Sequence, residues 1–454
     1  MTVRLRDISN CFQGVIPSIL ATSSKAGEPD VGYVSQVHYV DDTHVALACT
    51  AFDKTRVNVD ENPYASLRVH EPAAFDAYEL DLRFDHAETT GPLFDSMAVR
   101  IQAIASQTGM TGVLRLVSAD VYEVLDVRRL DAFLRPAAPD APKLVPATDH
   151  RSELRALQVV SDGLNRAKDL ESLLTTLLAA LRQELGFEHA RILLADDQQA
   201  RLFTVASTGY GESGVGAEVA MGAGLIGTVA RQKRILRISD VESDMRYGRA
   251  IRGEVTGSSL AHVLTPEIPL PGLPDARSHL GIPLLVHDRL VGVLAVESKS
   301  LLGFDEWHEA FLNIVGNQVA IAIDRMLDVE DEPPPPSQRA SALPPPSVKA
   351  RTFKFYRSDD CVFVDDEYLI RNVPARILWR LLQTFQREGR TEFTNRELRL
   401  DPSLGLPPVK DNLESRLILL RKRLEEKCPD VRIPSIGRGH FRLELECGLD
   451  LVEI

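Results

Sequence analysis

A basic pair beside two asparagines is the first group of residues that could bind a ligand. Lys54, Arg56, Asn58 and Asn62 stand in the stretch FDKTRVNVDENP, which ends at Pro63. Lysine supplies a compact charge and arginine a planar fork of donors, and both bind phosphate. The same residues fit a solvated turn between a strand and a helix, in which the asparagines cap the backbone locally. The residue types alone leave both interpretations open.

A second basic group lies near the C-terminus, in the stretch NLESRLILLRKRLEEK. Its leucines recur at alternating spacings of four and three residues from Leu413, which predicts a helix with one buried face. The candidate DNA-contacting residues of this helix are Asn412, Ser415, Arg416, Arg421, Lys422 and Arg423. Arg438 and Arg442 follow on a predicted hairpin around a glycine turn. Residues 410–442 hold 9 basic and 5 acidic residues, so a polyanion would meet this end of the chain first.

No pattern typical of catalysis or metal binding accompanies these groups. The sequence lacks nucleophile-elbow, zinc-protease, P-loop and EF-hand motifs, and its five scattered cysteines have no C-x-x-C spacing. We therefore expect no catalytic residues, no metal site and reduced, structural thiols. No apolar run approaches the roughly 20 residues that a membrane span needs, so we expect a cytoplasmic protein that does not bind membranes.

Length and composition predict several units. A chain of 454 residues exceeds one typical domain, and its net charge of −13 argues against a protein coated in nucleic acid. Residues 351–454 hold 19 basic and 18 acidic residues, so the negative charge lies upstream of them. The Pro-rich stretch 329–350 has the composition of an extended linker. With a softer boundary near 135–150, we predict units at 1–134, 150–328 and 351–454.

The hydrophobic pattern of the first unit predicts a small β-barrel. Short apolar or alternating runs predict strands near residues 17–24, 30–40, 44–50, 65–71 and 120–127. A helical pattern over 91–110 precedes the last of these strands.

The sequence patterns of the other two units predict mixed α+β folds. In the second, helical patterns, two strands, a glycine-rich segment, a hairpin over 278–298 and a closing helix capped by Asp305 predict an antiparallel sheet with helices on one side. In the third, strands precede a helix over 375–389 and a capping box of Thr394 and Glu397. The helix and hairpin described above complete a winged helix-turn-helix order. The predicted fold class is thus multidomain α+β.

Residues 10–130 resemble the pyridoxamine-phosphate-oxidase-like flavin split barrel. The resemblance rests on the turn at GEPD, the paired strands that follow and the K-x3-N-x3-N-P motif. In that family the lysine at the position of Lys54 lies beside the flavin phosphate, near residues of the preceding strand. The resemblance therefore implies FMN as a candidate cofactor, held by Ser35, Gln36, Lys54, Thr55, Arg56 and Asn58.

Residues 150–328 resemble a GAF domain. The matching stretches are GAGLIGTVARQKRILRISDVESDMRY, LGIPLLVHDRLVGVLAVES and FDEWHEAFLNIVGNQVAIAI. In GAF domains a small molecule binds between the sheet and the segments that correspond to the first of these stretches. The resemblance therefore implies a small-molecule ligand near Gly224, Ile226, Asp240 and Arg246.

Residues 351–445 resemble the winged-helix effector domain of OmpR-type response regulators. The recognition helix of that family ends in a pattern matched by Leu420-Arg421-Lys422-Arg423-Leu424, and its wing ends in a pattern matched by Phe441-Arg442-Leu443. The resemblance implies binding of double-stranded DNA through this helix and hairpin. Split barrels and GAF domains commonly form dimers, so we expect a homodimer that reads paired half-sites.

Together these features predict a one-component sensor and transcription regulator. The first two units would sense a small molecule or a redox state, and the third would bind DNA. One alternative is an FMN-dependent oxidoreductase with regulatory domains. Another is a signalling adaptor without DNA binding, because Ile418 and Leu419 are apolar where a DNA-facing surface is usually polar.

Overall fold

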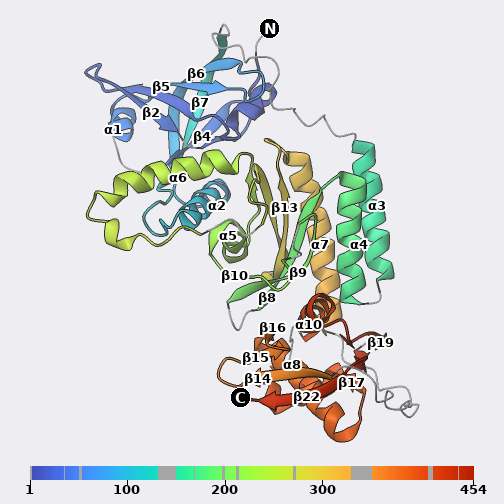
Figure 1. Ribbon diagram of the computed structural model, residues 1–454. Helices are drawn as coiled ribbons and strands as arrows, with labels where there is room; N and C mark the ends of the chain where they lie inside the picture. Colours follow the sequence, from blue (N-terminus) through green and yellow to red (C-terminus); the bar gives the residue numbers. More distant parts are fainter. Residues whose placement is uncertain are drawn as a thin grey trace.

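The structure is a computed structural model with three successive groups of elements along its length (Figure 1). It describes residues 3–34, 36–50, 54–130, 150–167, 169–196, 200–210, 214–268, 272–328, 350–406, 413–437 and 439–454. The predicted linker lies outside this range except for Ala350, and so do Ser35, Asn412 and Arg438. No helix among the described residues is long and apolar enough to cross a membrane.

The N-terminal unit is built on a curled antiparallel sheet with the strand order β2-β1-β5-β6-β7-β4-β3. Its strands are β1 (Ser18–Ser23), β2 (Pro29–Val34), β3 (Val37–Tyr39), β4 (His44–Cys49), β5 (Tyr64–His70), β6 (Ala77–Glu88) and β7 (Ser118–Leu130). Its helices are η1 (Leu5–Phe12), α1 (Lys54–Glu61) and α2 (Pro92–Gln107). Apolar side chains from η1 and the strands fill the curl of the sheet.

Strand β6 is a long central strand that the sequence did not predict. Only Leu80 and Leu82 of its middle are fully buried, and the charged Asp81 separates them. Its Glu79 and Asp81 carboxylates form ion pairs with Arg128 on the neighbouring strand β7. Cross-strand ion pairs therefore stabilise the charged face of β6. The hydrophobic pattern alone does not predict a strand with such a face.

The middle unit is a six-stranded antiparallel sheet with the order β10-β9-β8-β13-β12-β11. Its strands are β8 (His189–Asp196), β9 (Arg201–Thr208), β10 (Glu218–Ala220), β11 (Leu236–Ile238), β12 (Ser278–Val286) and β13 (Arg289–Ser298). Its helices are α3 (His150–Arg166), α4 (Leu170–Leu185), α5 (Gly224–Gln232), α6 (Val241–Thr256), η2 (Ala261–Val263) and α7 (Glu306–Asp328). Asp305 accepts the His308 N–H at 2.9 Å, which confirms its expected role as the cap of α7.

The prediction that helices cover one side of this sheet was wrong. Helices α3, α4 and α7 share one core with the sheet, whereas α5 and α6 pack on the opposite face in a second core (Figure 1). Strands β8, β12 and β13 are buried along nearly their whole length because both faces are covered. Such continuous burial gives apolar runs without alternation, so the pattern did not reveal the second layer.

Helix α2 of the N-terminal unit belongs to that second core. It packs on α5 and α6, and its apolar side chains join those of the middle sheet. The Arg100 guanidinium forms two hydrogen bonds to the Asp244 carboxylate of α6, at 3.0 and 2.8 Å. Both side chains are at most 10% exposed, so a buried ion pair joins the first two units.

The described part of the C-terminal unit combines a four-stranded sheet with three α-helices and two small sheets, β17-β20-β19 and β18-β21. The first sheet has the order β16-β15-β14-β22, where the unpredicted β22 (Gly448–Glu453) pairs in parallel with β14. The other elements are β14 (Ala350–Tyr356), β15 (Cys361–Val364), β16 (Glu367–Arg371), α8 (Asn372–Glu388), β17 (Glu392–Thr394), α9 (Asn395–Leu400), η3 (Pro402–Leu404), α10 (Leu413–Lys427), β18 (Val431–Arg432), β19 (Ser435–Gly437), β20 (His440–Arg442) and β21 (Glu444–Leu445). Strands β19 and β20 form the expected hairpin, which β17 extends to three strands.

The predicted capping box of α9 is half formed. Thr394 accepts the Glu397 N–H at 3.1 Å, as expected for an N-cap. The Glu397 carboxylate instead pairs with Arg390, at 2.6 Å from its Nη2 atom. The ion pair therefore replaces the second hydrogen bond of the box.

We predict that Arg100→Met lowers the free energy of unfolding by about 3–5 kcal/mol, because it leaves the Asp244 carboxylate buried without its counter-charge. The double variant Arg100→Met/Asp244→Leu should recover part of this loss. Arg246→Met is the matched control, since the Arg246 side chain is 75% exposed and pairs with Glu242 on the same helix. Urea unfolding of the full chain measures the effect. Equal midpoints for Arg100→Met and Arg246→Met would contradict the role of the pair.

Candidate functional site

Helix α10, the predicted DNA-contacting helix, lies against the middle unit. It contacts α4 and β9, and its Ile418 side chain is 1% exposed within the core that α3, α4 and α7 share with the sheet. In the opposite direction, Val215 of the middle unit is buried in the core of the C-terminal unit. The two units therefore exchange apolar side chains across one interface. Figure 1 shows α10 beside the end of the middle unit that carries β8.

A glycine allows the close approach of α10. Gly216 has a φ of +88°, and a Cβ atom at this position would lie 2.7 Å from Cδ1 of Leu419. Any other residue at this position would adopt a strained backbone conformation, and its Cβ atom would clash with Leu419. Leu419 is 9% exposed, so both apolar residues expected to face a partner are covered by this same chain.

Ion pairs across the interface use residues that the sequence assigned to DNA. Arg416 lies 3.2 Å from the Asp196 carboxylate of β8, and the two side chains are 11% and 7% exposed. Arg421 donates to the Ile433 carbonyl at 2.7 Å and lies 3.5 Å from the Glu171 carboxylate of α4. Arg416 therefore lies at the interface with the middle unit in this conformation, and its contact with DNA stays a prediction.

The remaining predicted DNA residues differ in their surroundings. Ser415 is buried beside Arg416, whereas Lys422 is half-buried. Arg423 pairs with Glu426 at 3.1 Å, and Arg442 of β20 pairs with Glu392 at 2.8 Å. Asn412 and Arg438 lie outside the described residues. The role of all these residues in DNA binding stays a prediction.

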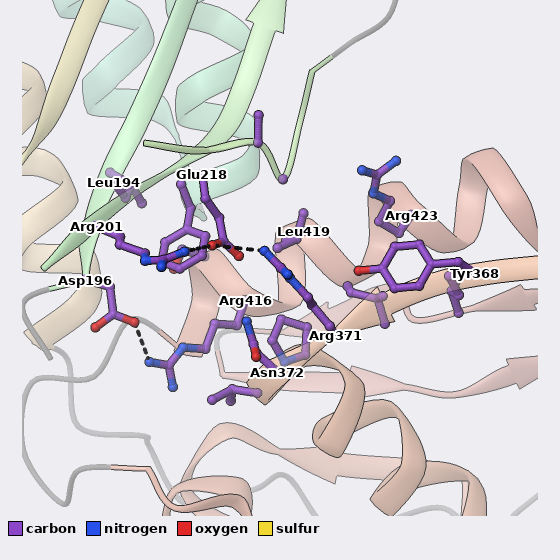
Figure 2. Close-up of a pocket in the computed structure, with 18 residues that line it drawn as sticks. Leu194, Asp196, Arg201, Glu218, Tyr368, Arg371, Asn372, Arg416, Leu419 and Arg423 are labelled. Carbon is purple, nitrogen blue, oxygen red and sulfur yellow. Dashed lines mark hydrogen bonds and ion pairs between the residues drawn. The ribbon is translucent and has the colours of Figure 1, made fainter. Parts of the chain in front are cut away.

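A cavity of about 580 Å³ lies between α10, the start of α8 and the edge of the middle sheet (Figure 2). Glu218 stands between two guanidiniums, with Arg201 at 2.5 Å and Arg371 at 3.3 Å. Tyr368 and Arg423 line the side opposite Arg201, and Asp196 and Arg416 meet below. The sequence did not single out Arg201, Glu218 or Arg371, because no motif links residues so far apart along the chain.

The residues expected to hold FMN bind other residues of the N-terminal unit instead. Lys54 donates to the Pro29 carbonyl at 3.2 Å, and Thr55 donates to the Asp30 carboxylate at 2.7 Å. Arg56 lies 3.0 Å from Asp60 and 3.0 Å from Asp120, with its guanidinium 4.8 Å from the centre of the Phe84 ring. The buried Asn58 donates to the Thr22 hydroxyl at 3.2 Å.

This arrangement does not fit a flavin phosphate. The carboxylates of Asp60 and Asp120 pair with Arg56, and Asp30 accepts from Thr55, so these three negative charges would repel the phosphate dianion. Gln36 is 7% exposed and lines a different cavity, of about 470 Å³, between the first two units. The motif is not the solvated turn of the alternative interpretation either, because Lys54–Glu61 form α1 and Asn58 is buried against Thr22 of β1.

The four residues expected around a GAF ligand do not converge on one site. Gly224 donates its N–H to the Ser106 hydroxyl of α2 at 2.8 Å, and Ile226 is 1% exposed in the second core. Asp240 accepts two hydrogen bonds from Arg277, at 3.2 and 3.1 Å. Arg246 points to solvent. Side chains of α2 and α5 fill the space where the resemblance implied a ligand.

We predict that the full chain has no saturable binding site for FMN, because the carboxylates that pair with Arg56 oppose a phosphate. Fluorescence quenching in an FMN titration tests this, with Lys54→Ala as the matched variant. Saturable binding that Lys54→Ala weakens by about 1.5–3 kcal/mol, the scale of a charged hydrogen bond, would contradict our interpretation.

Comparisons with known proteins identify the middle unit. The family model described as GAF domain matches residues 167–324. No curated protein matches the sequence. Among solved structures, the GAF domain of an Acinetobacter phosphoenolpyruvate-protein phosphotransferase is 20% identical, covers 41% of this chain and 99% of its own, and has a TM-score of 0.32.

Two further solved structures resemble parts of the chain. The GAF domain of a Coxiella burnetii phosphoenolpyruvate-protein phosphotransferase is 22% identical, covers 39% of this chain and 96% of its own, and has a TM-score of 0.32. An FMN-binding protein from Syntrophomonas wolfei is 19% identical, covers 28% of this chain and 85% of its own, and has a TM-score of 0.23. The family match establishes that residues 167–324 form a GAF domain.

Proposed function

We propose that this protein is a sensor and transcription regulator whose GAF domain holds a C-terminal winged helix in a docked state. The order α8, α9, α10 and then the hairpin β19–β20 supports a winged helix. In such a unit α10 would enter the major groove and the hairpin would contact phosphates. The GAF domain itself favours a sensory or signalling role.

The proposal rests on one observation: the helix expected to contact DNA, α10, also packs against the GAF domain. The helix that would read DNA is the helix that inserts Ile418 into the GAF core and pairs Arg416 with Asp196. DNA and the GAF domain would therefore compete for one face of α10. Two apolar residues on a DNA-reading helix have a physical reason in this scheme, because they form the docking surface in the state without DNA.

Docking would set the affinity for DNA. A protein whose binding-competent state is only partly populated binds with an affinity reduced by that fraction. The buried pair of Arg416 and Asp196 and the covered Ile418 favour the docked state. Any signal that weakens these contacts would raise DNA binding, which gives the GAF domain a direct means of control.

A homodimer would strengthen DNA binding further. Helix α7 exposes Trp307, Ile314 and Ile321 at intervals of seven residues, with exposures of 56%, 48% and 46%. Apolar residues at this spacing favour helix pairing between two copies. Two winged helices in one dimer would read paired half-sites and neutralise more phosphates than one.

The two alternatives have less support. An FMN-dependent oxidoreductase would need the cofactor that the carboxylates around Arg56 disfavour. An adaptor would use Ile418 and Leu419 to bind another protein, yet both are covered by the chain's own GAF domain and loop. Regulation of DNA binding accounts for both the basic and the apolar residues of α10.

We predict that Asp196→Lys raises the affinity for DNA tenfold or more, about 1.4 kcal/mol, because the introduced ammonium group would repel Arg416 and release α10. Gel shifts of full-length protein on genomic fragments at ~50 mM salt measure this, since low salt favours electrostatic binding. Adding Arg416→Ala to Asp196→Lys should then reduce sequence preference, because base contacts rather than phosphate contacts carry specificity.

Glu242→Lys is the matched control, because it makes the same charge change on α6, at a residue that pairs with Arg246 and Arg277. It should alter DNA binding little. If Asp196→Lys and Glu242→Lys bind DNA equally, docking does not control α10. If no variant binds any fragment, the winged helix does not serve DNA binding.

A further inference from the structure

The cavity between the GAF domain and the C-terminal unit carries an unbalanced positive charge. Glu218 is 14% exposed and faces both Arg201 and Arg371, so one carboxylate serves two guanidiniums. The other two arginines of the wall are matched, Arg416 by Asp196 and Arg423 by Glu426. A second carboxylate beside Arg201 and Arg371 would balance the site (Figure 2).

We propose that this cavity binds a small organic monoanion, an aromatic carboxylate, as the effector of the protein. The cavity volume of about 580 Å³ falls in the range of small-molecule sites, roughly 300–1,000 Å³. Its walls combine the guanidiniums with apolar surface from Phe203, Tyr368 and Leu419. A guanidinium binds a carboxylate with two parallel hydrogen bonds, and aromatic side chains accept a flat ring.

The space expected for a GAF ligand is filled by side chains, and this favours the interface cavity as the ligand site. The space between the GAF sheet and α5 is occupied by a continuous core that includes Ile226 and residues of α2. A ligand there would have to displace close-packed side chains. The interface cavity needs no such displacement, because its charged groups are already arranged around an open volume.

The position of the cavity determines the direction of its effect. Arg201 and Glu218 belong to the GAF domain, whereas Arg371 and Tyr368 belong to the C-terminal unit. A ligand that touches both units binds the docked state better than the released state and shifts the population toward it. This step rests on the proposed function: the anion would hold α10 on the GAF domain and lower DNA binding.

Calorimetry of the full chain with 2-naphthoate and its uncharged analogue 2-naphthamide tests the site without DNA. We expect saturable binding of naphthoate and at least tenfold weaker binding of naphthamide. Arg371→Gln should weaken naphthoate at least tenfold, and the variant should fold because the Arg371 side chain is 54% exposed. Arg246→Gln, which removes one arginine from the exposed face of α6, should bind naphthoate as the wild type does.

Three results would overturn the proposed site: no saturable binding of naphthoate, equal binding of naphthamide, or unchanged binding in Arg371→Gln. A gel-shift series with saturating naphthoate then tests the effect, and DNA affinity of the wild type should fall while that of Arg371→Gln stays constant. An increase in DNA affinity would overturn the locking effect. If naphthoate binds as expected and no DNA binding occurs at all, the proposed function fails while the anion site stands.

Discussion

The docking of α10 on the GAF sheet is the contact on which the arrangement of the C-terminal unit depends. Ile418 supplies the apolar part of this contact, and the pair of Arg416 with Asp196 supplies a buried charge interaction. A buried pair adds little net stability against an apolar replacement, but breaking it leaves an uncompensated charge. Such a contact is therefore specific without being strong, which suits the release of α10 that the proposed function requires.

The GAF domain is in contact with the other units on two sides. On one side, α2 completes the second core and fixes the N-terminal unit through Arg100 and Asp244. On the other side, α10 packs against β9 and α4 and encloses the cavity with Glu218. The two contacts differ in character. The first is an extensive apolar core, whereas the second combines a few apolar residues with charges and open volume, so the second is the one expected to respond to a ligand.

The sequence was informative where a pattern is local. The leucine spacing of α10 and the hairpin β12–β13 agreed with the structure because each depends on nearby residues. Strand β6 was missed because its outer face is charged, and the pairing of Arg416 was not foreseen because its partner Asp196 lies 220 residues earlier. The basic motif at Lys54 suggested a phosphate, yet Asp120 lies 64 residues beyond Arg56 and neutralises it in the fold. Single-sequence patterns do not encode such distant pairings.

Hydrogen exchange of the full chain, followed by mass spectrometry, tests the docked state most directly. In the wild type, amides of residues 214–220 and 413–424 should be protected together. In Ile418→Asp, which places a charge in the GAF core, both segments should exchange faster while α7 keeps its protection. Faster exchange confined to these two segments is the predicted result. Identical exchange of residues 214–220 in both proteins would contradict docking of α10 on the GAF domain.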